Sequence, residues 1–207
     1  MTSKLDLTAD DTALLIIDVQ NDFCPGGQLA VQDGDQVVAP INLMITSAAH
    51  IVATQDWHPD GHASFATSHE GRRPFDAIEF SYGMQTLWPD HCIQGSDGAA
   101  FHPALDTARA AAIIRKGMNP AVDSYSAFFE NDKKTQTGLA GYLRDIGCKQ
   151  LTVAGLATDF CVAWSALDGV SEGFEVKVQL ASCRGINFNG SLDAALENMR
   201  NCGVKLV

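Results

Sequence analysis

Short runs of apolar residues recur along the chain and predict the strands of a buried sheet. Most of these runs are continuous rather than alternating in polarity, which is typical of parallel strands covered on both faces. Runs of this length, bounded by polar or glycine-containing segments, favour strands over helices. The runs occupy residues 13–18, 51–55, 111–116, 151–155, 175–180 and 204–207.

Stretches with apolar residues three to four positions apart lie between several of these runs and predict helices. This spacing marks residues 36–49 and 137–146, because it places apolar side chains on one helix face. A third helix is predicted at 191–201, with Ser191 as its N-cap. The alternation of strands and helices predicts a doubly wound α/β sheet with helices on both faces, in a single domain spanning 1–207.

Residues 56–110 carry neither pattern. The stretch is interrupted repeatedly by glycine and proline, and four of the six histidines lie in it before Phe101. A connection of this length in a compact domain is usually functional. We therefore expect it to form a long metal-binding loop region.

Composition narrows the class of protein. A chain of 207 residues, 46% hydrophobic and 19% charged, is typical of a globular domain. The formal net charge of −11, without a Lys/Arg cluster, disfavours nucleic-acid partners and favours a small neutral substrate. No apolar run is long enough to span a bilayer, and the N-terminal residues lack the apolar core of a secretory signal. We expect a cytoplasmic protein without a membrane partner.

Cys161 stands apart from the other five cysteines because of its position. No C-x-x-C pair occurs, which argues against a structural zinc site and a disulfide framework. Cys161 lies in GLATDFCV, between the predicted strand at 151–155 and an expected helix. Ligands bind beyond the carboxyl ends of strands in open α/β sheets, and Asp18 and Lys116 end two other predicted strands.

These three side chains together predict nucleophilic catalysis. A thiol with its ordinary pKa of about 8.5 is mostly protonated at neutral pH, but a helix N-terminus and the ammonium of Lys116 both favour the thiolate. Asp18 is suited to general acid–base catalysis. The backbone N–H groups of Ala157 and Cys161 are candidates for an oxyanion hole. Cys161 alone reads as a small core residue, whereas the set favours a catalytic thiol.

A second set of residues, Asp56, His58 and His91, predicts a metal site. Residues i and i+2 of an extended segment share a face, so Asp56 and His58 can reach one ion. His91 adds a third ligand from the same long loop. Such nitrogen and oxygen donors suit one divalent ion, namely zinc, iron or manganese. Taken alone, Asp-x-His is equally consistent with a turn in which the histidine only forms hydrogen bonds.

Five motifs, in order along the chain, resemble those of bacterial nicotinamidases, which belong to the isochorismatase-like cysteine hydrolases. The resemblance extends from residue 13 to about residue 190 and so covers most of the chain. The motifs are DVQNDFCPGG (18–27), DWHPDGHASF (56–65), LWPDHCIQGS (87–96), KGMNPAVDSYSAFF (116–129) and GLATDFCV (155–162).

The resemblance implies an activity and assigns roles. It implies hydrolysis of the carboxamide of nicotinamide to nicotinate and ammonia through a cysteine thioester, in NAD salvage. Turnover of pyrazinamide is expected with it. It also implies a six-stranded parallel sheet, a cis peptide at Leu156–Ala157, and a metal that holds the pyridine nitrogen. The residues so matched are the triad Asp18, Lys116 and Cys161, the metal ligands Asp56, His58 and His91, and the pocket residues Phe23, Trp88 and Tyr125.

Several alternatives stay open at the level of sequence. His62 or Ser64 is a candidate for a fourth metal ligand, and the chain is a candidate homo-oligomer. An isochorismatase or N-carbamoyl amidohydrolase would share the α/β core, the acid and the lysine but needs no metal motif. A metallohydrolase would use metal-bound water and leave Cys161 without a role. A binding module would leave the strand-end residues unexplained, and a dinucleotide-binding dehydrogenase is disfavoured because no G-x-G-x-x-G follows the first strand.

Overall fold

The frame of the molecule is a six-stranded parallel sheet, seen in a computed structural model that describes residues 6–207. The strand order is β5-β2-β1-β6-β7-β8, and every neighbouring pair runs parallel. Each apolar run in the sequence forms one of these strands, so the predicted sheet is confirmed. The strands are β1 (Thr12–Ile17), β2 (His50–Asp56), β5 (Ala112–Lys116), β6 (Gln150–Leu156), β7 (Glu175–Arg184) and β8 (Lys205–Leu206).

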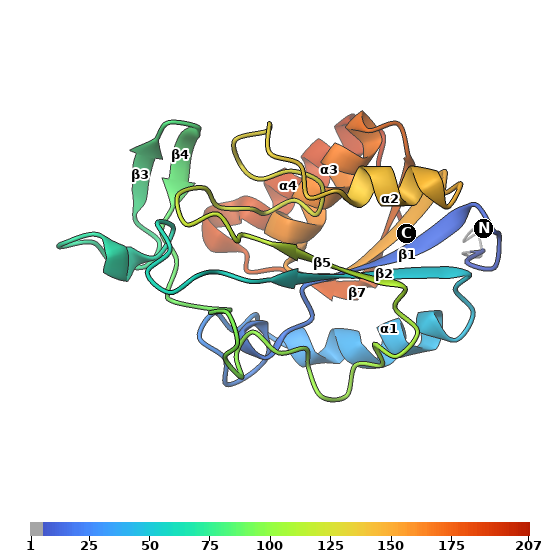
Figure 1. Ribbon diagram of the computed structural model, residues 1–207, viewed down its shortest axis with the longest axis horizontal. Coiled ribbons are helices and arrows are strands. Elements are labelled where there is room, and N and C mark those ends of the chain that lie inside the picture. Colours follow the sequence, from blue (N-terminus) through green and yellow to red (C-terminus); the bar gives the residue numbers. More distant parts are fainter. Residues whose placement is uncertain (1–5) are drawn as a thin grey trace.

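Helices cover both faces of this sheet (Figure 1). Helix α1 (Val38–Ile45) lies on one face, below the sheet in this view. Helices α2 (Leu139–Asp145), α3 (Ala163–Ser171) and α4 (Ser191–Asn201) lie on the opposite face. The prediction of a doubly wound α/β domain is therefore confirmed.

The central strand β1 shows why its sequence is apolar throughout. Leu14 and Ile16 pack in one buried cluster with Ile41 of α1. Leu15 packs in the other cluster, with Leu139 of α2. Because both faces of the strand are shielded from water, every residue of β1 is buried. Each fully buried aliphatic side chain of this size stabilises the fold by about 1.5–3 kcal/mol relative to its exposed state.

The helix boundaries differ from prediction at two points. The helix expected over 36–49 is shorter, because the chain forms a 3₁₀ turn at Gly34–Val37 before α1 begins. The prediction that Ser191 is an N-cap is wrong, since Gly190 occupies that position and Ser191 is the first helical residue. The hydroxyl of Ser191 instead donates to the carboxylate of Asp159. The hydroxyl thus donates to a distant carboxylate instead of accepting from a backbone N–H of its own helix, as an N-cap side chain does.

Residues 56–110 contain a small antiparallel hairpin that the sequence pattern does not predict. Its strands are β3 (Ala77–Phe80) and β4 (Gly83–Thr86), paired with each other and with no strand of the main sheet. Figure 1 shows the hairpin beyond the end of the sheet toward which β2 runs. Only Gln85 of its eight strand residues is buried, so the hairpin lacks the apolar signal of a core strand.

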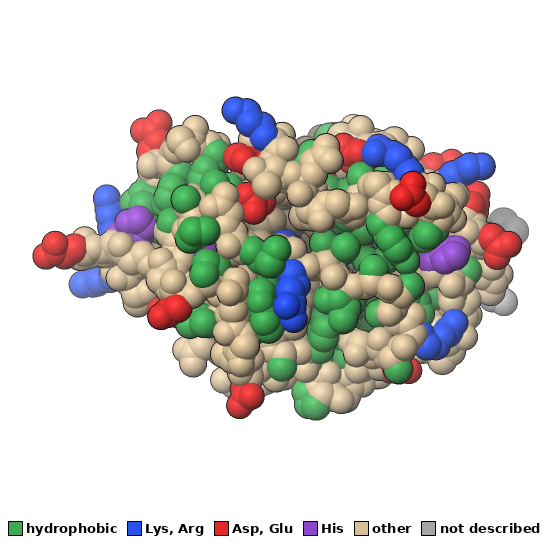
Figure 2. Space-filling view, viewed as in Figure 1, with side chains coloured by type: hydrophobic (Ala, Val, Ile, Leu, Met, Phe, Trp, Pro, Cys, Tyr) green, Lys and Arg blue, Asp and Glu red, His purple; other side chains and the backbone are tan. Residues whose placement is uncertain are grey.

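The surface carries dispersed charges. On the face shown in Figure 2, acidic and basic groups stand singly among polar and hydrophobic side chains. Hydrophobic side chains reach the surface over β5, the edge strand, where Ile113 is 49% exposed. Among residues 6–207, no helix is both long and apolar enough to cross a membrane.

Candidate active site

Four side chains converge where the strands of the sheet end. Asp56 and Lys116 are the last residues of β2 and β5 and lie opposite each other in the strand register. Asp18 directly follows β1, and β6 leads through a cis peptide at Leu156–Ala157 into a π-helical turn that carries Cys161. The strands adjoining β1 come from different halves of the chain, and such a point in an α/β sheet is where ligands bind.

Lys116 connects the groups that converge there. Its Nζ lies 2.8 Å from Asp18 Oδ2 and 3.5 Å from Cys161 Sγ. It also lies 3.0 Å from Asp56 Oδ1 and donates to the backbone oxygen of Ser124 at 2.9 Å. The predicted triad is thus brought together. One of the predicted metal ligands, Asp56, is ion-paired to the same lysine, which the sequence does not indicate.

The carboxylate of Asp18 is oriented by one neighbour. The backbone N–H of Asp18 donates to Thr54 Oγ1 at 3.1 Å, and that hydroxyl donates on to Asp18 Oδ1 at 2.6 Å. Asp18 Oδ2 faces Lys116 and accepts no well-oriented hydrogen bond from residues 6–207. Oδ1 is therefore held in place by Thr54, whereas Oδ2 has a lone pair that can accept a proton.

Burial controls the protonation states at these strand ends. Burial raises the pKa of the Cys161 thiol well above its ordinary value; Lys116 opposes this shift, and the Asp18 carboxylate adds to it. Burial also raises the pKa of Asp18, although Lys116 opposes that shift. Burial would lower the pKa of Lys116, but the two carboxylates raise it overall, so the lysine stays charged. Burial thus acts against the thiolate that Lys116 favours.

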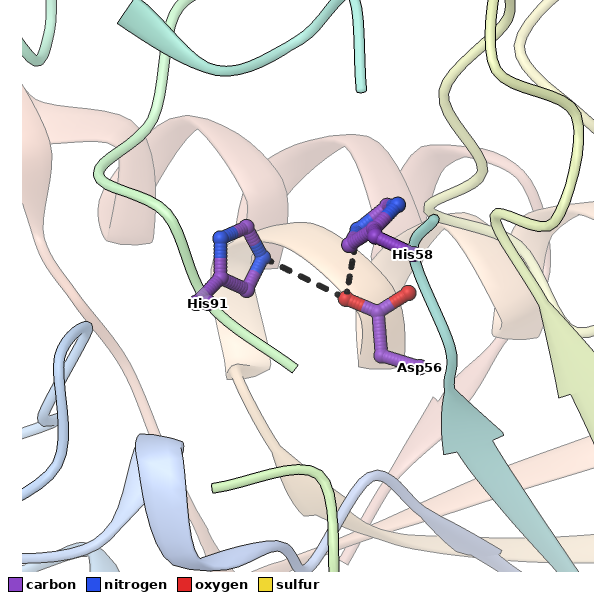
Figure 3. Close-up of side chains that lie close together, drawn as sticks. All are labelled: Asp56, His58 and His91. Carbon is purple, nitrogen blue, oxygen red and sulfur yellow. Dashed lines mark hydrogen bonds and ion pairs between the residues drawn. The ribbon is translucent and has the colours of Figure 1, made fainter. Parts of the chain in front are cut away.

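Asp56, His58 and His91 also come together, as Figure 3 shows. Their potential ligand atoms all lie within 4.8 Å of one another, and the three residues are buried. The Nε2 atoms of His58 and His91 lie 3.1 and 3.4 Å from the same oxygen, Asp56 Oδ2. The Nδ1 atoms are held by backbone oxygens, at 3.0 Å from Gly117 for His58 and 2.8 Å from Pro89 for His91.

This donor set fits a divalent metal ion. A backbone oxygen on Nδ1 selects the tautomer that leaves Nε2 free to bind, as is usual for metal-binding histidines. Gly117 permits the close approach, because a Cβ there would lie 2.5 Å from Cε1 of His58. Its φ of +67° also favours glycine.

His62 and Ser64, the candidates for a fourth ligand, lie outside this set. His62 Nδ1 is 2.8 Å from Ser64 Oγ, and His62 Nε2 is 2.7 Å from the backbone oxygen of Asn119. Both ring nitrogens therefore have partners within the protein. The His62 ring packs against His58, with centroids 4.4 Å apart, and supports that side chain rather than adding a donor.

One cavity joins the thiol to the candidate metal ligands. Its wall includes Cys161, Ala157, Asp56 and His91, so both sets of residues face the same space. A larger surface hollow of about 440 Å³ lies elsewhere and is lined by none of these four residues. The remaining residues of the cavity wall are Phe23, Leu29, Trp88, Asp123, Tyr125, Phe160 and Ile186.

Comparison with known proteins shows to which family this chain belongs. A sequence model of the isochorismatase domain matches residues 12–207. The chain belongs to the isochorismatase family. It is 50% identical to a nicotinamidase of Acinetobacter baylyi over 199 residues. This matched region covers 96% of this chain and 93% of the Acinetobacter baylyi protein.

Solved structures of the family agree in fold. The nicotinamidase/pyrazinamidase of Acinetobacter baumannii is 51% identical, covers 96% of each chain and gives a TM-score of 0.95. A protein from Leishmania infantum in complex with nicotinate is 38% identical, covers 97% of this chain and 94% of its own, and gives a TM-score of 0.84. The pyrazinamidase of Pyrococcus horikoshii in complex with zinc is 36% identical and gives a TM-score of 0.77. The match covers 95% of this chain and 98% of that chain.

Within this isochorismatase-family site, Gln85 is a residue that sequence reasoning missed. From the β3–β4 hairpin, its Nε2 donates to Asp123 Oδ2 at 2.8 Å and to Tyr125 Oη at 2.9 Å. Trp88 Nε1 donates to the same hydroxyl at 3.1 Å. The hairpin thus supports the aromatic wall of the cavity. Nothing local to Gln85 signals this role, because its partners lie about forty residues along the chain.

Proposed function

We propose that this protein hydrolyses the carboxamide of nicotinamide to nicotinate and ammonia. The observation that carries the proposal is the shared cavity, in which a thiol paired with a lysine and an acid faces a buried Asp/His₂ group. The nicotinamidase and pyrazinamidase relatives support the substrate class, and pyrazinamide is a second expected substrate. The product suits a role in NAD salvage.

The triad supplies the covalent chemistry. Cys161 Sγ attacks the carboxamide carbon while its proton passes to Asp18, whose Oδ2 has free lone-pair capacity. Asp18 returns that proton to the departing nitrogen, so ammonia leaves and a thioester remains. Asp18 then takes a proton from the water molecule that attacks the thioester carbon, and passes it to the departing sulfur. This step restores the thiol and the Asp18 carboxylate and releases nicotinic acid, which ionises to nicotinate in solution. The ammonium of Lys116 stabilises the negative charge that passes between the acid and the thiol.

The oxyanion formed at each attack lies next to the nucleophile. Ala157 and Cys161 both line the cavity, and we assign their backbone N–H groups to the oxyanion hole. Donors of this kind act on charge that develops only in the transition state, and one such donor typically contributes about 2.7–4 kcal/mol.

Asp56, His58 and His91 would hold the metal ion, and the zinc complex of the Pyrococcus horikoshii relative supports a divalent ion. When bound, such an ion offers an open coordination position to the pyridine nitrogen. The charge of Asp56 is retained for this purpose: burial would raise its pKa, but His58 and Lys116 hold the pKa well below its usual range. The Asp/His₂ donors suit zinc, iron or manganese.

Aromatic side chains would hold the ring. Phe23 and Trp88 are buried and line the cavity with Tyr125. Trp88 and Tyr125 meet edge to face, with centroids 6.1 Å apart, and a neutral heteroaromatic ring suits such a wall. No charged group is needed to recognise this substrate, which agrees with the acidic composition.

An ammonia-release assay on nicotinamide, with elemental analysis of the same sample, tests the proposal. We expect ammonia and nicotinate in equal amounts from protein that holds about one equivalent of metal. Alkylation of Cys161 separates this reaction from hydrolysis by metal-bound water, because only the former is abolished. Absence of ammonia release from metal-loaded protein contradicts the proposal. A cytoplasmic location, the lack of a nucleic-acid partner and a homo-oligomeric state stay predictions.

A further inference from the structure

The segment 185–190, between β7 and α4, forms one side of the cavity, and we call it the outer wall. Ile186 from this segment lines the cavity together with Cys161 and Phe160. Two residues on, Phe188 stacks on Phe75, with centroids 5.1 Å apart and an interplanar angle of 30°. Phe75 in turn meets Trp88 edge to face at 5.9 Å. The outer wall therefore extends from the side of the thiol to the side of the aromatic residues.

Asp159 attaches the outer wall to the turn that carries the nucleophile. Its carboxylate accepts the backbone N–H of Ile186 at 2.9 Å and that of Asn187 at 2.7 Å, and the hydroxyl of Ser191 donates to it as well. Asp159 is buried and lies two residues before Cys161. Charge-assisted hydrogen bonds of this type are the stronger ones in proteins. The proposed mechanism gives this buried acid no other task.

The cavity needs an adjustable side to admit a ring. Its volume is about 20 Å³, which is room for about one water molecule and not for a pyridine ring. Trp88 and Phe23 are almost fully buried, and Tyr125 is held by two N–H donors. Ile186 is only partly buried, on a segment that belongs to neither β7 nor α4. The Ile186 side chain is therefore neither almost fully buried, as Phe23 and Trp88 are, nor held by a side-chain hydrogen bond, as Tyr125 is.

We propose that Ile186 determines substrate specificity by limiting the size of the ring substituent that the cavity accepts, and that Asp159 positions Ile186. This inference rests on the proposed function for the substrate class. An apolar side chain in this place discriminates by volume, and one methyl group in an apolar pocket changes relative kcat/KM by about 10- to 200-fold. Asp159 acts through the outer wall and touches neither the substrate nor the reacting atoms.

The first test replaces Ile186 by alanine and measures ammonia release from nicotinamide and from its four ring-methylated isomers. For each isomer, kcat/KM is divided by the value for nicotinamide. We expect this ratio to rise about tenfold or more for at least one isomer in I186A. The matched control is Ile113→Ala on β5, which truncates an isoleucine outside the cavity and should leave every ratio unchanged. Ratios in I186A equal to those of the wild type for all four isomers overturn the inference.

The second test is Asp159→Asn, which keeps the shape of the side chain but offers one acceptor oxygen in place of two. We expect KM for nicotinamide to rise about tenfold and kcat to change less. The kcat/KM ratios of the methylated isomers to nicotinamide should shift in the same direction as in I186A. Asp168→Asn on α3 is the control, because Asp168 pairs with Lys133 and does not line the cavity. A fall in kcat with unchanged KM and ratios overturns the positioning role.

The wild-type measurement separates the two levels of the account. If wild-type protein releases no ammonia from nicotinamide, the proposed function fails, and the inference fails with it. If the wild type is active and the ratios of I186A are unchanged, only the inference about the outer wall fails.

Discussion

The two sides of the cavity are built in different ways. The side formed by strand ends carries Asp18, Asp56 and Lys116, and their relative positions follow from the register of neighbouring parallel strands. The outer wall, 185–190, belongs to no strand of the sheet, and Asp159 connects it to the turn that carries Cys161. In the proposed reaction, the sheet thus sets the positions of the reacting groups, while a loop would contact the rest of the substrate.

This difference leads to a clear expectation for mutations. Changes at the strand ends should reduce the rate for every substrate in parallel, because all substrates share the same reacting carboxamide. Changes in the outer wall should alter the order of preference among substrates and leave the chemistry intact.

The largest effect is expected for Cys161→Ala. Removal of the nucleophile should lower kcat by about 10⁴-fold or more, because no other side chain offers a thiol to the cavity. The measurement is ammonia release from nicotinamide. Cys202→Ala is the control, since Cys202 is exposed and should retain full activity. A C161A protein with near-normal turnover would show that the thiol is incidental.

Asp18→Asn is expected to have the next largest effect. The amide is nearly isosteric but cannot take the thiol proton, so kcat should fall by about 10²- to 10⁴-fold. The fall should be similar for nicotinamide and pyrazinamide, because both present the same carboxamide. A loss confined to one substrate would contradict the separation between strand ends and outer wall.

His91→Ala should remove metal from the protein. Loss of one of three protein ligands should weaken metal binding by at least about 100-fold, more than loss of an outer hydrogen-bond partner does. Elemental analysis after dialysis measures this directly. His102→Ala is the matched control, because His102 lies outside the Asp56, His58 and His91 group. Equal metal content in the two variants would overturn the assignment of the site.

A smaller effect is expected for Gly117→Ala, compared with Gly61→Ala. Both glycines have φ near +70°, so both substitutions cost about 1 kcal/mol of stability from the backbone. A Cβ at Gly117 also meets the His58 ring, whereas a Cβ at Gly61 meets nothing within 4 Å. Chemical denaturation should show G117A to be the less stable by about 1–3 kcal/mol. Equal stability of the two variants would show that the His58 ring moves freely away from a Cβ at position 117.

The smallest effect concerns the order of thiol labelling. At pH 7–8, iodoacetamide should modify exposed Cys202 before buried Cys161, since burial raises the pKa of Cys161 and keeps it protonated. Activity should persist while only Cys202 is labelled and should fall as Cys161 reacts. Peptide mapping against residual activity checks this order. Rapid labelling of Cys161 at neutral pH would mean that its thiolate is already formed at rest.

The sheet and the reacting residues are largely predictable from the sequence. Because β1 and β6 are covered on both faces, their apolar runs suffice to locate them. Because parallel strand ends meet at one edge, the residues that end them are expected to be neighbours, and Asp18 and Lys116 are. The candidate metal ligands follow from Asp-x-His together with a histidine in the same long loop, and the structure brings these three side chains together.

The remaining features depend on distant parts of the chain and leave no local signal. The β3–β4 hairpin is mostly exposed, and Gln85 matters only through its contacts with Asp123 and Tyr125. Ser191 has the sequence of an N-cap but donates to Asp159 instead. The protonation state of Cys161 depends on complete burial, which a sequence pattern does not show.

Mass spectrometry of rapidly quenched reactions tests the central claim most directly, that Cys161 bonds to the substrate carbon. Nicotinamide is mixed with the metal-loaded protein, the reaction is stopped with acid, and the peptide that contains Cys161 is examined. The account predicts that this peptide gains the mass of one nicotinoyl group during turnover and loses it when the substrate is exhausted. Rapid turnover with an unmodified Cys161 peptide at every time, together with undiminished activity of C161A, would contradict it.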